Sequence, residues 1–209
     1  MTKSVLIIAN GPPPQDKLLN KLVVDADIII AADGGANTCY KKNINPDFII
    51  GDLDSIKSDV KSHFSKAEII YRPNQNKDDF YKTLTFCDTL NPEKVIATAV
   101  LGMRFDHSLS NLFSLQSGSF NFQIELYDDY GITAIIKKER MLNLQVGQTI
   151  SLTSFLPVFG ITLTGFKYLL NNKDFPQGFN GLSNEMTESP AQIRVKKGSL
   201  ISYILHAND

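Results

Sequence analysis

Short apolar runs alternate with longer helical patterns over the first 126 positions of this 209-residue chain. The expected strands are residues 4–10, 26–32, 47–50, 68–71, 94–100 and 123–126. Between them, helices are expected over residues 16–24, 36–42 and 56–64, with two more ending near residues 90 and 115. Continuously apolar strands that are separated by helices are typical of a parallel sheet covered on both faces. The first part of the chain therefore predicts an α/β domain with a mostly parallel sheet covered by helices.

The pattern changes after about Tyr130. Further strands, rich in β-branched residues, are expected at residues 141–146, 149–155, 161–170, 191–195 and 200–205. Gly147, Gly160 and Gly198 fall between them, and no helical pattern intervenes. This part predicts a smaller all-β sandwich or barrel. We therefore expect two domains, residues 1–130 and residues 131–209.

Composition limits the classes of function. Hydrophobic residues make up 43% of the chain, as in folded globular proteins, and the formal net charge of −1 gives no signature for binding nucleic acid. The first apolar run is too short for a signal peptide, and no segment approaches the length of a membrane span. Cys39 and Cys87 fit no metal or disulfide pattern, and indicate thiols in a reducing cytoplasm. We expect a cytoplasmic protein with no membrane and no nucleic-acid partner.

Two acids follow the third expected strand, where Gly51 is succeeded by Asp52 and Asp54. In extended backbone, residues two positions apart point to the same side, so both carboxylates would converge on one cation. Mg²⁺ commonly takes one or two carboxylates and completes its coordination with water and phosphate oxygens. The alternative is a turn in which Asp54 or Ser55 caps the next helix.

Polar residues also follow the other expected strands. Parallel sheets bind ligands outside the carboxyl ends of their strands. The polar residues expected at these ends are Asp33, Asp52, Asp54, residues 74–79, Arg104 and Asp106. Several such groups along one edge predict a site there.

Each of the remaining groups at this edge has two interpretations. The segment from Asp33 to Asn37 is either a phosphate-binding turn at a helix N-terminus or an ordinary strand-to-helix turn. Asp79 and Lys82 are either ligand-binding groups or a helical ion pair. Arg104 either clamps a phosphate or pairs with neighbouring acids, and Asp106 is also a plausible N-cap.

Carboxylates for a metal, an arginine for phosphate and a glycine-rich turn together indicate phosphoryl-type transfer. The chain has neither a P-loop nor the protein-kinase motifs, so a nucleotide would be held differently.

Five motifs, in order along the chain, resemble those of the thiamine pyrophosphokinase family. They are residues 33–37, residues 51–55, Gln75 with Asp79 and Lys82, residues 104–107, and residues 183–185. The resemblance implies an α/β catalytic domain that binds ATP and Mg²⁺, and a C-terminal β domain that contributes thiamine binding and dimerisation. It further implies a homodimer that transfers a pyrophosphoryl group from ATP to thiamine, giving thiamine diphosphate and AMP.

The resemblance also implies roles for single residues. The metal and phosphate acids are Asp52, Asp54 and Asp79, and Arg104 and Asp106 complete the catalytic set. The groups expected on the ATP side are Asp33, Gly34, Gly35, Asn37, Gln75, Lys82 and His107. The groups expected at the thiamine end are Ser183 and Asn184, which by sequence alone would be a loop between strands.

The chain departs from the family pattern at several positions. Asn74 and Asn76 stand where many members have aspartates, Asp78 where a threonine is usual, and Met103 where a glycine is usual. The chain has no tryptophan, so an aromatic contact to thiamine must come from Phe or Tyr. Two alternatives stay open at this stage: a pyrophosphokinase for another hydroxymethyl heterocycle such as a pterin, and a non-catalytic module that binds thiamine or nucleotide.

Overall fold

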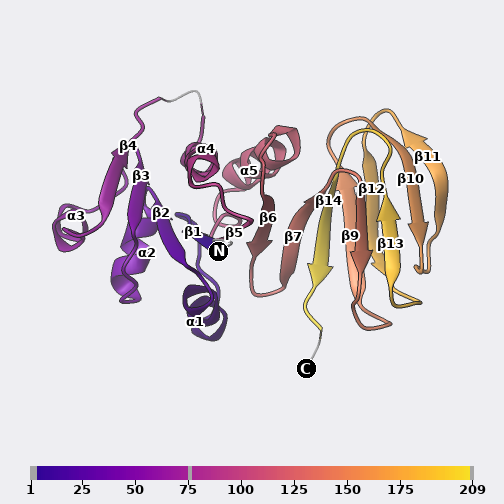
Figure 1. Cartoon of the computed structure of the whole chain (residues 1–209), viewed down its shortest axis with the longest axis horizontal. Helices are drawn as coiled ribbons and strands as arrows, with labels where there is room; N and C mark the ends of the chain where they lie inside the picture. The colour runs from indigo at the N-terminus through magenta and orange to yellow at the C-terminus, as the bar shows by residue number, and fades with distance from the viewer. Residues whose placement is uncertain (1–3, 75–76, 208–209) are drawn as a thin grey trace. The chain divides into compact units, whose positions relative to one another are not determined.

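A computed structural model describes residues 4–74 and 77–207 of the chain (Figure 1). The chain divides into two compact units, Met1–Asp129 and Tyr130–Asp209. Each unit has its own apolar core, and each is described by itself.

The first unit is built on six parallel strands. They are β1 (Ser4–Ile8), β2 (Ile28–Ala32), β3 (Phe48–Gly51), β4 (Glu68–Tyr71), β5 (Lys94–Thr98) and β6 (Gln123–Tyr127). Within the unit their order is β6-β5-β1-β2-β3-β4, and every neighbouring pair is parallel. The predicted mostly parallel sheet is confirmed.

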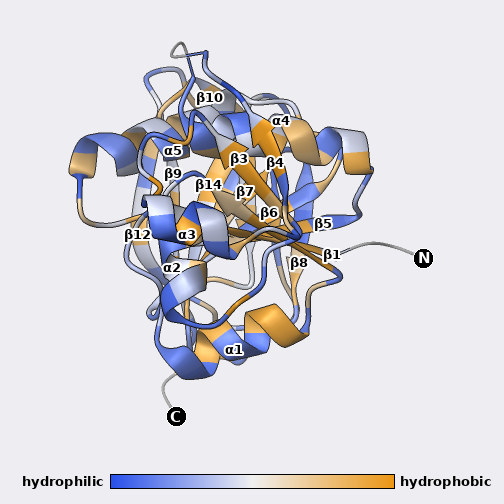
Figure 2. Ribbon diagram, turned by 90° about the vertical axis from the view of Figure 1, so that its left-hand side faces the viewer, coloured by the Kyte–Doolittle hydropathy of each residue, from blue (hydrophilic) through white to orange (hydrophobic). Residues whose placement is uncertain are grey.

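Five helices connect these strands: α1 (Asp16–Val24), α2 (Gly35–Lys41), α3 (Ser58–His63), α4 (Asp79–Leu90) and α5 (Phe105–Ser117). The first three share one apolar cluster with the sheet, to which α1 contributes Leu19 and Leu22, and α2 contributes Ala36 and Cys39. Figure 2 shows α4 and α5 on the opposite side of the strands from α1 and α2. Helices therefore cover both faces, as the continuously apolar strands predicted.

The strand order fixes where a ligand can bind. From β1 the chain builds the sheet outward through β2, β3 and β4, and then returns to place β5 on the other side of β1. The connections on either side of this reversal leave a crevice at the carboxyl ends of the strands, which is where open α/β sheets bind ligands.

The second unit is a sandwich of two antiparallel sheets, which decides between the predicted sandwich and barrel. One sheet has the order β12-β9-β14-β7, and the other has the order β11-β10-β13-β8. The strands are β7 (Gly131–Ile136), β8 (Glu139–Leu142), β9 (Thr149–Ser154), β10 (Val158–Thr164), β11 (Leu170–Phe175), β12 (Phe179–Glu185), β13 (Ala191–Arg194) and β14 (Leu200–Leu205). Alternate residues such as Ile150, Leu152, Ile161 and Ile193 form the core between the sheets.

Sequence reading was wrong about several strands of this unit. The strand expected at residues 141–146 ends at Leu142, and the strand expected at residues 161–170 ends at Thr164. The loop expected at residues 183–185 is the end of β12. Both β11 and β12 were missed, because they stand last in the strand order of their sheets and carry mostly polar residues, so they lack an apolar alternation.

Two further findings bear on the expectations from composition. Within the described part of the chain, no helix is long and apolar enough to cross a membrane. Cys39 and Cys87 are both buried free thiols, and burial raises the pKa of each to about 12.

Candidate active site

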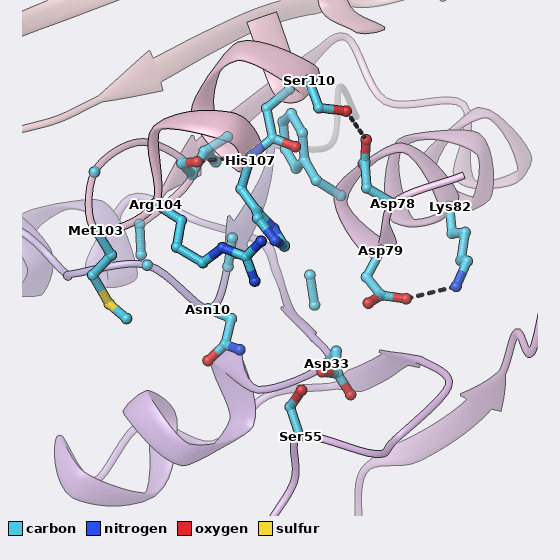
Figure 3. A pocket seen from close by; sticks show the side chains of 18 of the residues that line it. Asn10, Asp33, Ser55, Asp78, Asp79, Lys82, Met103, Arg104, His107 and Ser110 are labelled. Carbon is cyan, nitrogen blue, oxygen red and sulfur yellow. Dashed lines mark hydrogen bonds and ion pairs between the residues drawn. The ribbon is translucent and has the colours of Figure 1, made fainter. Parts of the chain in front are cut away.

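A cleft of about 640 Å³ opens at the carboxyl edge of the sheet in the first unit (Figure 3). Its walls come from the loops after β1, β2, β3 and β5 and from the first turns of α4 and α5. The polar side chains that line it are Asn10, Asp33, Asp52, Ser55, Lys77, Asp78, Asp79, Lys82, Arg104, His107, Ser110 and Asn111. Most of the sequence-predicted groups at this edge therefore share one cavity.

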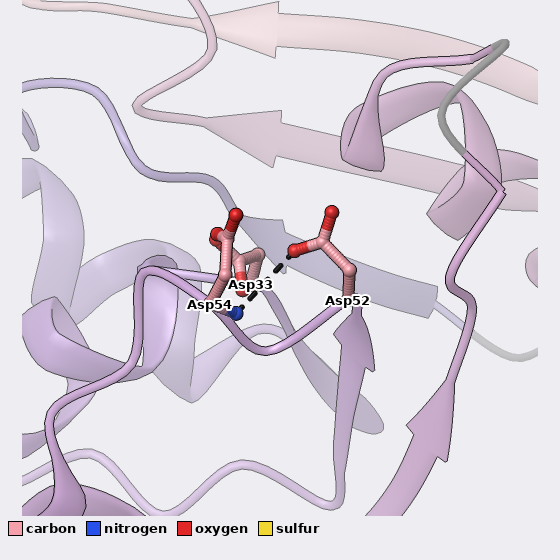
Figure 4. A group of neighbouring side chains, drawn as sticks. All are labelled: Asp33, Asp52 and Asp54. Atoms are coloured by element: carbon pink, nitrogen blue, oxygen red, sulfur yellow. Dashed lines mark hydrogen bonds between the residues drawn. The ribbon is translucent and has the colours of Figure 1, made fainter.

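Three carboxylates converge beside this cleft (Figure 4). Asp33, Asp52 and Asp54 each place one ligand atom within 4.8 Å of the others. The predicted convergence of Asp52 and Asp54 is therefore present, but the extended backbone invoked for it is wrong. Leu53 between them has a positive φ of 66°, and this turn brings the two acids together.

The capping alternative for Asp54 and Ser55 is also wrong. Helix α3 begins at Ser58, its N-cap is Lys57, and no side chain caps it. Instead, the Ser55 hydroxyl donates to Asp54 Oδ1 at 2.9 Å, and the Asp54 backbone N–H faces Asp52 Oδ1 at 3.4 Å. These contacts fix the two acids relative to each other.

Asp33 is the buried member of the three, with 3% of its surface exposed. It follows β2 with a positive φ of 43°, and its backbone N–H donates to Ile50 O at 2.7 Å. Burial raises the pKa of its carboxyl, although hydrogen bonds from Ser55 and from the Gly34 backbone act in the opposite direction. Among the described residues, its Oδ1 atom has no hydrogen-bond partner.

Gly51 leaves room for these acids. It has a φ of 155°, and a Cβ atom at this position would lie 2.8 Å from Asp33 Cβ and 3.3 Å from Asp79 Oδ1. Any side chain here would displace one of the two aspartates. The glycine before Asp52 is therefore required by close packing of the site.

Asp79 and Lys82 form an ion pair within α4, as one of the two interpretations of these residues predicted. The distance from Lys82 Nζ to Asp79 Oδ1 is 2.8 Å, and the same ammonium lies 3.9 Å from Asp52 Oδ2. Burial raises the pKa of Asp79, while the hydrogen bond and charge of Lys82 act to lower it. Because Lys82 is itself buried and lines the cleft, the pair belongs to the site as well as to the helix.

Asp78 begins α4 as its N-cap, accepting from the Tyr81 backbone N–H at 2.7 Å. Its other oxygen accepts from Ser110 Oγ on α5 at 3.2 Å. This acid, which stands where a threonine is usual in the family, thus joins the start of α4 to the second turn of α5.

Arg104 and Asp106 make a two-pronged ion pair, with Nε–Oδ1 and Nη2–Oδ2 distances of 3.1 and 2.5 Å. The hydrogen bond from Arg104 lowers the pKa of Asp106 to about 2, although both groups are exposed. Helix α5 begins at Phe105 with Arg104 as N-cap, so the N-cap interpretation of Asp106 is wrong. Figure 3 shows Arg104 and His107 across the cleft from Asp79 and Asp33.

The glycine-rich turn has a packing role. A Cβ atom at Gly35 would lie 2.0 Å from Ile8 O, so α2 approaches β1 too closely for any other residue. Asn37 donates to Ser55 O at 2.8 Å and accepts from the Lys57 backbone N–H at 3.2 Å. Gly34, Gly35 and Asn37 are not among the described residues that line the cleft, and Asn37 holds the loop that follows Asp54 in place.

Sequence reading did not single out several cleft residues, and one predicted residue, Gln75, lies outside the described part of the chain. Asn10 and Gly11 follow β1, so the rule used for the other strand ends would have found them. Asn111 lies within α5, where no such rule applies. Its Nδ2 donates to Val100 O at 2.8 Å and fixes the loop after β5.

Ser183 and Asn184 belong to the second unit. Asn184 is buried, its Nδ2 donates to Tyr168 O at 2.8 Å, and its Oδ1 accepts from the backbone N–H groups of Tyr168 and Glu185, both at 2.9 Å. Ser183 sits where the β12–β9 pairing is irregular, with a φ of 53°, and its N–H donates to Ser151 Oγ at 3.0 Å. Asn184 therefore fixes the backbone of Tyr168, a residue that is 62% exposed.

Comparison with known proteins gives matches to both units. A family model described as the thiamin pyrophosphokinase catalytic domain matches residues 19–127, and one described as the thiamin pyrophosphokinase vitamin B1 binding domain matches residues 134–200. The chain is 27% identical over 208 residues to the thiamine pyrophosphokinase of Bacillus subtilis (strain 168), covering 95% of this chain and 97% of that protein. It is also 27% identical over 221 residues to thiamin pyrophosphokinase 1 of Caenorhabditis elegans, covering 96% and 88%.

The fold agrees with these matches. The crystal structure of thiamine pyrophosphokinase from Bacillus subtilis superposes with a TM-score of 0.83 at 26% identity, covering 99% of this chain and 100% of that one. The catalytic-domain model alone spans just over half of the chain. The resemblance read from the five motifs is confirmed, and the chain belongs to the thiamine pyrophosphokinase family of ATP-dependent diphosphotransferases.

Proposed function

We propose that this chain makes thiamine diphosphate and AMP from thiamine and ATP. The observation that carries the proposal is one cleft lined by the acids Asp33, Asp52 and Asp79 and, across from Asp33 and Asp79, by Arg104 and His107. Pyrophosphoryl transfer needs acids that hold a cation on one side of the site and groups that bind phosphate on the other. Family membership supplies the identity of the two substrates.

The reaction itself asks little covalent chemistry of the protein. The hydroxyl oxygen of thiamine forms a bond to the β-phosphorus of ATP. The bond from that phosphorus to the oxygen bridging the α-phosphorus breaks, AMP leaves with the bridging oxygen, and the hydroxyl proton is released. The protein must hold the two substrates in line and stabilise the charge on the transferred group.

The acids fit a magnesium ion, because their donor atoms are all carboxylate oxygens, which this hard cation prefers. Asp52 and Asp54 would hold it, and Asp79 lines the same cleft as the third acid that the resemblance names. A magnesium ion bound there would neutralise phosphate charge and orient the polyphosphate chain.

Cationic side chains would position the phosphates. Arg104 is exposed at the cleft and presents a planar fork that suits phosphate oxygens as well as it suits Asp106. Exchange of the Asp106 carboxylate for a phosphate would keep the same geometry of donors. Lys82, already held by Asp79, would act as a fixed positive charge at the floor of the cleft.

The thiamine end and the assembly belong to the same proposal. Ser183 and the Tyr168 ring that Asn184 supports are the groups proposed to contact thiamine. Large apolar residues are exposed on the same unit, namely Tyr168, Leu169 and Leu182. Such exposed apolar side chains support a homodimer in which a second copy covers them. A cytoplasmic setting is proposed on the two buried thiols, which a reducing compartment keeps free.

Incubation with ATP, Mg²⁺ and a panel of alcohols tests the proposal. Thiamine should be consumed and AMP should appear in step with thiamine diphosphate, whereas a hydroxymethyl pterin should give no nucleotide product. Asp52→Asn serves as the inactive control. Turnover with the pterin instead of thiamine, or no thiamine-dependent turnover at all, would reject the assignment.

A further inference from the structure

We propose that strand β4 pairs with β4 of a second copy of this chain, in antiparallel orientation and with the two Ile70 residues opposite each other. The contact belongs to the first unit. The homodimer surface proposed above, with Tyr168, Leu169 and Leu182, belongs to the second unit, so β4 provides a separate interface. The inference does not depend on the proposed function.

Strand β4 is the last strand of its sheet (Figure 1). Among the strands that the structure describes, only β3 pairs with it, and the register runs without a shift from Phe48 beside Glu68 to Gly51 beside Tyr71. The other edge of β4 therefore carries backbone groups without a strand partner. Such an edge is a template for pairing with another chain.

The backbone groups that face outward belong to Ile69 and Tyr71. The N–H groups of Glu68 and Arg72 bond to carbonyl oxygens on the β3 side, at N–O distances of 2.9 and 2.7 Å. Successive residues of a strand direct their backbone groups to opposite edges. The two residues that alternate with these donors and Ile70 thus each present an N–H and a C=O at the open edge.

The ends of this open edge select one register. With Ile69 opposite Tyr71 of the second copy, each such pair exchanges two backbone hydrogen bonds, and two-fold symmetry forms the pair twice. A shift in either direction would leave one carbonyl of each copy without a donor, because Pro73 has no N–H and the Ala67 N–H already donates to Phe64 O at 3.1 Å. Only the register centred on Ile70 satisfies every outward group of both residues.

Charge favours the same register. It sets Glu68 of each copy opposite Arg72 of the other, in a position where facing side chains lie closest together. Both residues are exposed, and neither has an ion-pair partner among the residues that the structure describes. Opposite charges that face each other across two strands stabilise the pairing, whereas a register centred on Ile69 would place Lys66 opposite Arg72.

Apolar side chains complete the match on the other face of the sheet. Ile69 is 39% exposed and Tyr71 is 61% exposed. In the proposed register each Ile69 lies opposite Tyr71 of the second copy, and a β-branched residue facing an aromatic one is a favourable cross-strand pair. A second copy of the chain would therefore cover both side chains.

Sedimentation of the full chain, from about 1 µM to about 1 mM, tests the interface by the concentration at which the mass doubles. Glu68→Arg and Arg72→Glu each set like charges opposite each other twice, and each should raise this concentration about tenfold. The double variant with both changes restores the pairs and should return it to within about threefold of wild type. Glu93→Arg, the same change at an exposed acid outside β4, should leave it unaltered.

Disulfide formation tests the register. Facing Cα atoms at Ile70 would be about 4.5 Å apart, which a disulfide spans. With oxidised glutathione, Ile70→Cys should give a covalent dimer, since Cys39 and Cys87 are buried. Ile69→Cys does not face its own copy and should react about tenfold more slowly, although residue 69 is more exposed than residue 70.

Three results would overturn the proposal: a mass that does not double below about 1 mM, a doubling that Arg72→Glu leaves unchanged, and cross-linking of Ile69→Cys as fast as that of Ile70→Cys. If Ile70→Cys does not fold, the charge exchange decides alone, because its variants alter exposed side chains. Neither measurement involves turnover. A homodimer formed through the second unit would only raise the mass from which the doubling starts.

Discussion

The ammonium nitrogen Nζ of Lys82 lies 2.8 Å from Asp79 Oδ1, one helical turn away in α4. Both residues line the acidic cleft, and Lys82 is 8% exposed. Burying an ammonium group costs free energy, and a hydrogen-bonded carboxylate offsets part of that cost. The pair therefore sets a fixed positive charge next to Asp52, at a Nζ–Oδ2 distance of 3.9 Å.

Replacing Lys82 by methionine should affect both activity and stability. The variant keeps the apolar stem but leaves the Asp79 carboxylate without its donor, so the free energy of unfolding should fall by about 1–3 kcal/mol. The turnover number should fall at least tenfold, and Lys82→Arg should restore part of it. The coupling between the two side chains is measured by urea unfolding of Lys82→Met, of Asp79→Asn and of the double variant that carries both changes. Strictly additive losses would show that the two side chains do not interact.

Substitution of Gly51 by alanine tests the close packing around the acids. The new Cβ would lie 2.8 Å from Asp33 Cβ, in a backbone conformation with positive φ. Gly147→Ala is the matched control, because Gly147 also has a positive φ, of 91°, but a Cβ there meets nothing within 4 Å. We expect the free energy of unfolding of the control to fall by about 1 kcal/mol, because of backbone strain. In Gly51→Ala the free energy of unfolding should fall by about 1–3 kcal/mol more than in the control, because of overpacking. This variant should also lose most of its activity. Equal effects in the two variants would contradict the packing argument.

Much of the first unit was predictable because its strands are buried on both faces and therefore read as apolar runs. The predicted bounds of α1 and β4 agree with those observed, and the strand-end rule placed Asp52, Asp79 and Arg104 at one edge. The second unit was harder, since the polar strands β11 and β12 carry no such signal.

The limits at the site have a different cause. Asn37 supports a loop 18 to 20 residues further along the chain, and Asn184 fixes the backbone of Tyr168, 16 residues before it. Contacts at such distances depend on the completed fold. A local pattern identifies the residue type, but it does not distinguish a side chain that touches a ligand from one that supports the residue that does.

The raised pKa values of Asp33 and Asp79 predict a pH dependence of stability in the metal-free chain. Burial raises both above the ordinary value of 3.8. The folded state therefore binds these protons more tightly than the unfolded state does. Their contribution to stability is complete below about pH 4 and is lost as the pH rises through the folded pKa values.

Asp33→Asn removes one of these titrations. In EDTA, the variant should gain stability relative to the wild type when the pH is raised from about 4 to 8. Urea unfolding at both pH values measures the difference. A variant whose stability differs from that of the wild type by the same amount at pH 4 and pH 8 would show that Asp33 has an ordinary pKa.

The proposed homodimer predicts complementation between two inactive variants. Asp52→Asn removes a metal acid in the first unit, and Asn184→Ala leaves the backbone of Tyr168 unsupported in the second. If two copies contribute to each site, half of the randomly exchanged dimers are mixed and half of their sites carry no lesion. About a quarter of wild-type activity should return on mixing. No recovery, with exchange verified by mass-labelled subunits, would show that one copy supplies both residues.

The position of phosphoryl attack is the most direct test of the proposed function. Parallel reactions with [α-³²P]ATP and [γ-³²P]ATP, in the presence of Mg²⁺ and thiamine, follow the two ends of the polyphosphate chain. Attack on the β-phosphorus sends the γ label into thiamine diphosphate and leaves the α label in AMP, in equal amounts. A γ label in thiamine monophosphate, with the α label in ADP, would contradict the account.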